Sequence, residues 1–145
     1  NLGAGRPDRA ERSVWRAAGY NMLFLGAVAV CFFTLSGPIM QLFTDDPAAV
    51  RWGRQCLRIL SLGYVFYALG MVVSQSFNGA GDTRTPTLLN LVGFWVIQVP
   101  LAYGLALTWE RGPTGVFAAI AASEALLALM SVWVFRRGRW KRVKV

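Results

Sequence analysis

Residues 17–44 read AAGYNMLFLGAVAVCFFTLSGPIMQLFT, twenty-eight consecutive residues without a charged side chain. A helix rises 1.5 Å per residue, so about 20 residues cross the hydrocarbon core of a bilayer. The stretch is therefore long enough to form a transmembrane helix. It is too long for the apolar region of a secretory signal peptide, which has about 7 to 15 residues.

Three more stretches of this kind follow along the chain. Residues 59–81 and 85–109 contain no charged residue, and residues 112–135 contain one, Glu124. Hydrophobic residues make up 55% of the chain and charged residues only 15%, outside the usual range of a soluble domain. The sequence therefore predicts an all-α membrane protein with four transmembrane helices. These spans are expected at residues 18–43, 54–78, 86–108 and 114–135.

The Lys and Arg residues are distributed unevenly around these spans. Four spans place both termini on one side, which carries eleven of the 15 basic residues. The other four lie on the opposite side: Arg51, Arg54, Arg58 and Arg111. By the positive-inside rule, the loop at residues 1–17 and the basic tail at residues 136–145 are both predicted to be cytoplasmic, in an inner or plasma membrane.

The net charge of +8 is explained by the position of the basic residues beside the spans. The tail is expected to anchor the topology beside anionic lipid, with Trp133 and Trp140 near the membrane interface. Nucleic acid is not an expected partner, because basic residues do not alternate with exposed stacking aromatics outside the spans.

Several chemistries lack the residues they need. The chain contains no His, and its two thiols, Cys31 and Cys56, lie at different predicted depths, which disfavours a disulfide. Neither a metal site nor a His-based triad can be built, and no cofactor is expected. Asp45, Asp46 and Asp82 lie in predicted turns without a His or Cys partner, so an enzyme is not predicted.

Capping residues and prolines indicate where the helices begin. Asp46 before Pro47 is typical of an N-cap followed by a first-turn proline, and Thr85 before Pro86 has the same pattern. Pro100 lies inside the third span, where it removes a backbone hydrogen bond, so we expect the helix to bend or open locally.

Small residues recur on one side of the second and fourth spans. Gly63 and Gly70 share a face of the second span, and Gly115, Ala119 and Ser123 recur every four residues on the fourth. Such faces allow helix backbones to approach closely. They predict contacts within a four-helix bundle or with helices outside this chain.

Glu124 is the most unusual residue of the spans. It lies 11 residues after Pro113, about 16 Å into the fourth helix. A carboxylate at that depth costs about 2.5 to 3.5 kcal/mol on insertion scales, so it should face a partner, a cavity or an ion. The other candidates for a cavity lining are uncharged polar residues within the spans: Tyr64, Tyr67, Asn90 and Gln98. Most in-span polar residues form interhelical hydrogen bonds, whereas a subset lining an amphipathic cavity would suit bulky organic cations.

Arg58 is the candidate partner of Glu124. It lies 11 residues after Pro47, the same offset that separates Glu124 from Pro113. An ion pair between Arg58 and Glu124 would make the glutamate structural. In the rival interpretation Glu124 is unpaired in a cavity and takes up a proton or a cationic drug. The second helix is long enough that its start can project from the membrane, which would leave Arg58 shallower than Glu124.

Three stretches together resemble a known family. Residues 1–10, NLGAGRPDRA, resemble the cytoplasmic G-Q-N-x-G-A-G-x-x-x-R-A loop of the multidrug and toxic compound extrusion (MATE) transporters. Residues 78–86, NGAGDTRTP, look like the family's R-G-A-G-D-T-R-x-P loop, with Asn78 in place of its Arg. Residues 138–141, GRWK, look like its usual C-terminal ending. The matching loop positions are Gly3, Gly5, Gly79, Gly81, Asp82 and Arg84.

The resemblance implies helices nine to twelve of a twelve-helix protein, part of its C-terminal six-helix lobe. The chain begins with Asn1 rather than Met, and we interpret it as a fragment. The implied activity is an antiporter that exports drugs and other amphipathic organic cations in exchange for sodium ions or protons, by alternating access of two lobes. Its partners would be the missing helices of the same transporter and the lipid bilayer. Tyr67 stands where one branch of the family has a carboxylate, so the coupling ion stays open.

Two alternatives remain open at this point. The chain could be a self-contained four-helix membrane protein, either a small exporter that dimerises or a structural subunit. The second alternative is a membrane-embedded enzyme such as a lipid-head-group transferase, which the lack of clustered acids, metal ligands or a nucleophile with its base disfavours.

Overall fold

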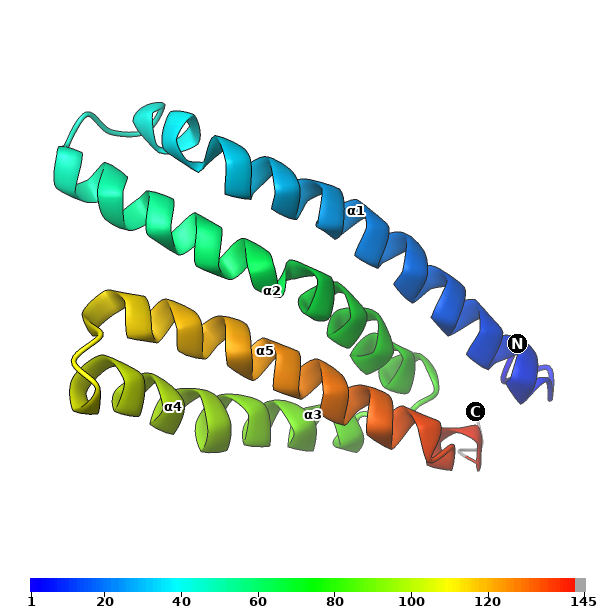
Figure 1. The fold of residues 1–145 in the computed structure, drawn as a ribbon. Coiled ribbons are helices and arrows are strands. Elements are labelled where there is room, and N and C mark those ends of the chain that lie inside the picture. The colour runs from blue at the N-terminus through cyan, green and yellow to red at the C-terminus, as the bar shows by residue number, and fades with distance from the viewer. Residues whose placement is uncertain (143–145) are drawn as a thin grey trace.

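The computed structural model of the chain describes residues 1–142, and its regular elements there are helices (Figure 1). α1 (Pro7–Gln41) and α2 (Pro47–Gly79) are long and α-helical, and α5 (Gly112–Arg136) is the last long helix. A third rod between α2 and α5 combines four segments: α3 (Arg84–Leu91), η1 (Val92–Gln98), α4 (Val99–Tyr103) and η2 (Gly104–Thr108). A short 3-10 helix, η3 (Arg139–Arg142), follows α5. The four rods are long and apolar enough to cross a membrane, which confirms the predicted all-α class.

The helix starts follow local chemistry, with two differences from expectation. Asp46 caps α2 as predicted, because its carboxylate accepts from the Ala48 N–H at 3.0 Å. The third rod begins at Arg84 rather than at Pro86. Its N-cap residue is Thr83, without a side-chain cap, and the Asp82 carboxylate just before it accepts from the Thr85 N–H at 3.1 Å. Residues 7–17, predicted as a loop, are helical, with Pro7 in the first turn of α1 where its missing N–H costs nothing.

Pro100 opens the third rod as expected. The segments on both sides of it, η1 and η2, are π-helical. A residue that cannot donate to the preceding turn interrupts the regular ladder, and wider turns absorb the mismatch. The glutamine that ends η1, Gln98, lies in this opened stretch.

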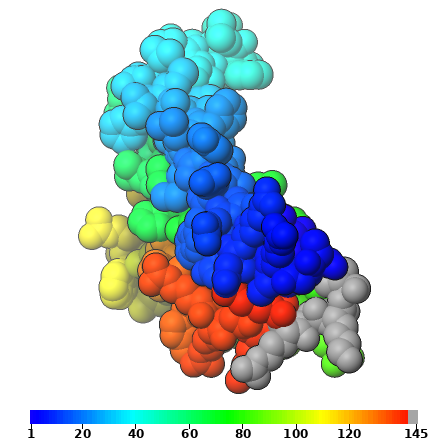
Figure 2. Space-filling model, turned by 90° about the vertical axis from the view of Figure 1, so that its right-hand side faces the viewer, coloured from blue at the N-terminus to red at the C-terminus, as the bar shows by residue number. Residues whose placement is uncertain are grey.

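The rods lie side by side, and both ends of the described chain lie at one end of the bundle (Figure 1). We call this the basal end, formed by residues 1–15, 77–89 and 135–142. The opposite, distal end carries the loops at residues 42–46 and 109–111. α1 packs along α2, α2 packs along α5, and the third rod packs along the other side of α5. Figure 2 shows the first residues of α1 against the last turns of α5.

The contacts of α5 use small residues, as predicted. A methyl group added at Gly63 would lie 3.4 Å from the Ala121 Cα, and one at Gly70 would lie 3.2 Å from the Ala128 Cα. On the other face of α5, a methyl group at Gly115 would lie 2.6 Å from the Leu105 carbonyl carbon. Glycine therefore permits backbone-to-backbone contact on two sides of α5.

The largest buried side chains gather at the basal end. Phe77 of α2, Phe135 of α5 and Trp140 of η3 are buried there in one cluster. Trp140 is 3% exposed, so its indole packs against protein, and its place near the membrane interface stays a prediction. The chain turns back after α5 and inserts this indole into the cluster. Trp133, by contrast, is 57% exposed.

Candidate functional site

A hollow of about 510 Å³ lies between α1, α2 and α5, and we call it the α1-side hollow. Its walls are largely aliphatic and aromatic, with one carboxylate. The lining residues are Leu25, Val28, Phe32, Leu60, Gly63, Tyr64, Tyr67, Ile120, Ala121 and Glu124. The small residues Gly63 and Ala121 leave space that larger side chains would fill.

A second hollow of about 190 Å³ lies between α2, the third rod and α5, and we call it the α3-side hollow. Polar groups contribute more of its wall. The lining residues are Tyr67, Gly70, Met71, Ser74, Gln75, Asn90, Phe94, Glu124, Leu127, Ala128 and Ser131. Tyr67 and Glu124 line both hollows, so these two residues stand where the hollows meet.

Glu124 is half-buried on α5. Within residues 1–142 no ion pair or hydrogen bond engages its carboxylate. A charge removed from water without a partner is unfavourable, whereas a bound proton or cation relieves that cost. The structure therefore leaves Glu124 available to a ligand from either hollow.

The other predicted cavity residues fall into two groups: three line a hollow, and one forms an interhelical hydrogen bond beside Glu124. Tyr64 and Tyr67 line the α1-side hollow, and Asn90 lines the α3-side hollow. Gln98 lines neither. Its side-chain oxygen accepts from the hydroxyl of buried Ser123, the neighbour of Glu124 in sequence, at 3.0 Å. Gln98 thus makes the interhelical hydrogen bond expected of most in-span polar residues.

Arg58 takes partners other than Glu124. Its Nε donates to the Phe33 carbonyl oxygen at 3.3 Å and to the Ser36 hydroxyl at 3.1 Å, and its guanidinium lies 5.5 Å from the Phe33 ring centroid. These contacts hold α1 just before Pro38, a proline inside the helix. The predicted Arg58 to Glu124 ion pair is not formed in this structure.

The register of α2 against α5 explains the difference in depth. Gly63 lies beside Ala121 and Gly70 beside Ala128, so Glu124 is level with the residues around Tyr67. That level is about 13 Å along the helix axis from Arg58, since the two positions differ by nine residues. Equal offsets from the two prolines do not give equal depth because α2 begins farther toward the distal end.

Sequence reasoning missed the contribution of α1 to the hollow. Phe32 meets Tyr64 edge-on, with ring centroids 6.0 Å apart, and Leu25 and Val28 continue the wall. The spacing of these three α1 residues, i, i+3 and i+7, places them on one helix face and is a signal that could have found them.

The residues of the family-like loops lie at the basal end. Gly5 and Gly81 have positive φ values of 68° and 81°, a conformation that favours glycine, and the Asp82 carboxylate accepts from the Thr85 N–H in the first turn of the third rod. Gly3 and Gly79 have open space around them, and Arg84 is exposed. These residues shape two turns and do not line either hollow.

Metal-ligating groups do not cluster in the part of the chain that the structure describes. No group of three or more His, Cys, Asp or Glu side chains there could hold a metal ion. Cys31 and Cys56 are free thiols. The carboxylate of Glu124 is the charged group that the hollows offer to a ligand.

Four membrane-length helices, packed through glycine and alanine around a hollow with one carboxylate, define an α-helical integral membrane protein. The MatE family model matches residues 1–104. The chain belongs to the MatE family, which confirms the resemblance of its loops.

Similar proteins extend well beyond this chain. A Rhodopseudomonas palustris protein named "Probable multidrug resistance protein NorM" is 29% identical over 140 residues, which cover 94% of this chain and 30% of that protein. A Burkholderia vietnamiensis "Multidrug resistance protein NorM" is 33% identical over 139 residues, covering 92% of this chain and 30% of that protein. The chain thus spans about 30% of the length of these relatives.

A solved structure has the same fold. "MATE transporter ClbM in complex with Rb+" superimposes with a TM-score of 0.90 at 26% sequence identity. The match covers all of this chain and 35% of that one. The four-rod arrangement is therefore that of part of a MATE transporter.

Proposed function

We propose that this chain forms part of a membrane antiporter that exports drugs and other amphipathic organic cations in exchange for sodium ions or protons. The observation that carries the proposal is Glu124, which lines both hollows without a partner among residues 1–142. The relatives named as multidrug resistance proteins support drug export, and the Rb+ bound to a similar transporter supports a monovalent cation.

The chemistry of the α1-side hollow suits this exchange. Aromatic rings from Phe32, Tyr64 and Tyr67 can face the apolar body and the charge of an organic cation. Glu124 supplies the opposite charge, and a proton or a sodium ion competes for the same carboxylate. Because only one positive species neutralises it at a time, entry of one favours release of the other.

The remaining helices complete the transporter in this proposal. The chain would lie in one of two lobes whose relative movement exposes the hollows to either side of the membrane in turn. The missing helices of the same protein and the bilayer would cover apolar faces such as those of Leu23 and Trp95, which are 75% and 70% exposed. The chain reconstituted alone should give no ethidium flux, and ion-coupled flux would contradict this part of the proposal.

Glu124→Gln tests the proposed role in the full-length protein that contains this chain. The substitution keeps the size of the side chain and removes its charge, so normal folding with loss of ion-coupled ethidium export is expected. Glu110→Gln, in an exposed loop, is the matched control and should export normally. Imposing sodium and pH gradients separately identifies the coupling ion. Full export by Glu124→Gln would overturn the role of this residue.

We also propose that both ends of the chain face the cytoplasm of an inner or plasma membrane, with spans near residues 18–43, 54–78, 86–108 and 114–135. The uneven distribution of basic residues supports this orientation. With Cys31 and Cys56 replaced by Ser, an impermeant thiol reagent should reach Asp45→Cys or Arg111→Cys from outside intact cells. Labelling only after permeabilisation would show the opposite orientation.

A further inference from the structure

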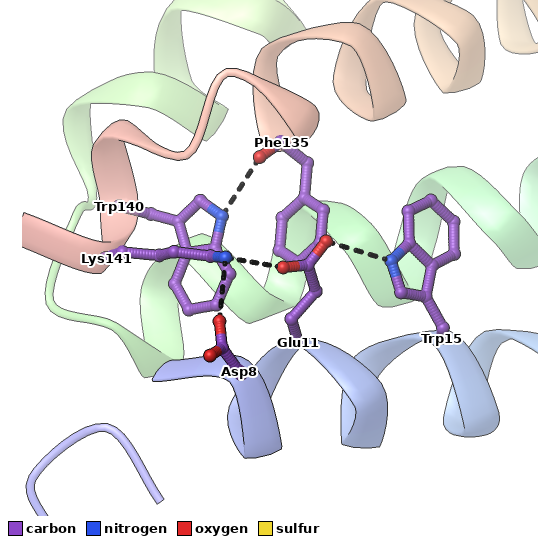
Figure 3. Close-up of polar contacts among 6 residues, drawn as sticks. All are labelled: Asp8, Glu11, Trp15, Phe135, Trp140 and Lys141. Carbon is purple, nitrogen blue, oxygen red and sulfur yellow. Dashed lines mark hydrogen bonds and ion pairs between the residues drawn. The ribbon is translucent and has the colours of Figure 1, made fainter. Parts of the chain in front are cut away.

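The chain reverses direction directly after α5. Gly138 has a φ of 70°, in the left-handed region that favours glycine, and the following η3 returns Trp140 to the end of α5. The Trp140 indole stacks on the Phe135 ring, with centroids 4.8 Å apart and planes at 11°, and its N–H donates to the Phe135 carbonyl oxygen at 3.0 Å (Figure 3). The reversal is therefore held by both packing and a buried hydrogen bond.

This reversal brings Lys141 to the first turns of α1. Its Nζ lies 2.6 Å from Glu11 Oε2 and 3.5 Å from Asp8 Oδ1 (Figure 3). The other Glu11 oxygen accepts from the Trp15 indole N–H at 3.4 Å, and the Trp15 ring meets Phe135 edge-on at 5.7 Å. Side chains from η3 and from the end of α5 thus contact the same face of α1.

The two helices joined in this way form opposite walls of the α1-side hollow. Val28 and Phe32 line it from α1, and Ile120 and Glu124 line it from α5. Between the basal end and the distal loops, α1 rests on α2, with Asn21 donating to the Ala68 carbonyl oxygen at 3.2 Å. The spacing between α1 and α5 therefore depends on α2 and on the basal connection.

We propose that Trp140 and Lys141 form a clasp that holds the basal end of α1 to α5 and thereby sets the width of the α1-side hollow. Lys141 is a positioning residue that acts through Glu11 and Asp8. The proposal rests on the proposed function only for the use of the hollow in transport. The clasp itself is tested by a distance, which can be measured whether or not Glu124 binds a cation.

The charges around Glu11 make the clasp sensitive to pH. Lys141 pairs with Glu11 directly, and Asp8 shares the Lys141 ammonium group. The Trp15 indole N–H donates to Glu11, and the guanidinium of Arg136 lies 5.8 Å from the centroid of the Trp15 ring. The hydrogen bond from Lys141 lowers the pKa of Glu11 below its ordinary value, against the opposing effect of burial. The Lys141–Glu11 pair of the clasp is accordingly formed when Glu11 is ionised and is lost as the pH falls through this lowered pKa.

The experiment measures the distance between spin labels on exposed positions of the two walls, Ala27→Cys and Ala122→Cys, in the full-length protein with Cys31 and Cys56 replaced by Ser. Lys141→Met removes the charge and keeps an apolar stem, so a longer and broader distance distribution is expected. Arg139→Met is the matched control, because Arg139 is exposed and outside the clasp, and it should match the parent protein.

Exchanging the charges at positions 11 and 141 tests whether the ion pair, rather than another property of Lys141, sets the distance. The triple variant Asp8→Asn, Glu11→Lys, Lys141→Glu, which also removes the like charge that Asp8 would present to a glutamate at position 141, should restore the narrow distribution that Lys141→Met broadens. A narrow parent-like distribution in Lys141→Met would overturn the proposal, as would broadening that the exchange fails to reverse.

Acid titration keeps the proposal testable if Lys141→Met does not fold. The parent distribution should broaden as the pH falls through the pKa of Glu11, and Glu11→Gln should be broad and insensitive over the same range. A parent distribution that stays narrow after Glu11 is protonated would overturn the clasp.

Discussion

The basal end and the middle of the bundle hold the same helices together in different ways. At the basal end, the large rings of Phe77, Phe135 and Trp140 fill the space between helices. At the surface there, Lys141 forms an ion pair with Glu11 of α1. In the middle, Gly63 and Ala121 bring backbones into contact and leave a hollow of about 510 Å³ beside them. The comparison indicates that the basal end fixes helix positions, whereas the middle keeps room for a ligand.

The physical setting explains this division. Lipid is as apolar as a leucine side chain, so burial gives little driving force between helices inside a membrane, and close contact of small residues takes its place. At the ends of the apolar runs, where water is near, burying an aromatic ring is favourable again because water is the alternative. Large side chains therefore stabilise the helix ends, and small ones stabilise the middle.

Trp140→Ala should have the largest effect on stability. It empties a fully packed site and removes a hydrogen bond, so we expect a loss of about 3 to 5 kcal/mol in the free energy of unfolding. Denaturant unfolding in detergent micelles measures this loss. Trp133→Ala, at a side chain that is 57% exposed, is the control and should cost much less. Equal losses would remove the distinction between the basal cluster and the exposed surface.

Gly115→Ala should have the next largest effect. The added methyl group would lie 2.6 Å from the Leu105 carbonyl carbon, and backbone cannot move aside as a flexible side chain can. We expect a loss of about 1 to 3 kcal/mol from overpacking, measured by the same unfolding assay. Gly104→Ala, which meets nothing within 4 Å, is the control and should be neutral or slightly stabilising. A stable Gly115→Ala variant would show that α5 and η2 can move apart at this contact without loss of stability.

Lys141→Met should destabilise the fold least. The side chains of Lys141 and Glu11 are 29% and 31% exposed, and ion pairs accessible to water contribute at most about 1 kcal/mol. The expected decrease in unfolding free energy is therefore below about 1 kcal/mol even if the hollow widens. A loss as large as that of Trp140→Ala would show that the ion pair, rather than the ring stack, holds the basal end.

The small contribution of this pair should depend on pH at both extremes. The pKa of Glu11 is lowered by Lys141, so the contribution is complete above the ordinary Glu value of about 4.3 and is lost as the pH falls through the lowered pKa. The pKa of Lys141 is raised by Glu11, so the contribution persists below about 10.4 and is lost as the pH rises through the raised pKa. Melting temperatures of the parent and Glu11→Gln should converge at both extremes. A constant difference would contradict the coupling.

Much of the fold was predictable because it depends on local properties of the chain. Uncharged runs such as residues 17–44 specify membrane-length helices, and Asp46 and Pro100 act on their own backbone neighbours. The start of the third rod was missed by a few residues because Thr85, expected as the cap, lies inside the helix and donates both its N–H and its hydroxyl to the Asp82 carboxylate. Glu124 stood out from composition alone, since a lone charge in an apolar run is costly.

The sequence by itself determined the helices, their number among the described residues, and the presence of one carboxylate among apolar neighbours. Only the tertiary structure decided what each side chain meets. Arg58 bonds α1 instead of Glu124, Phe32 closes the hollow, and Lys141 pairs with a glutamate 130 residues earlier in the chain. These contacts depend on the register between helices and on the reversal at Gly138, and neither run length nor periodicity specifies how one helix slides along another.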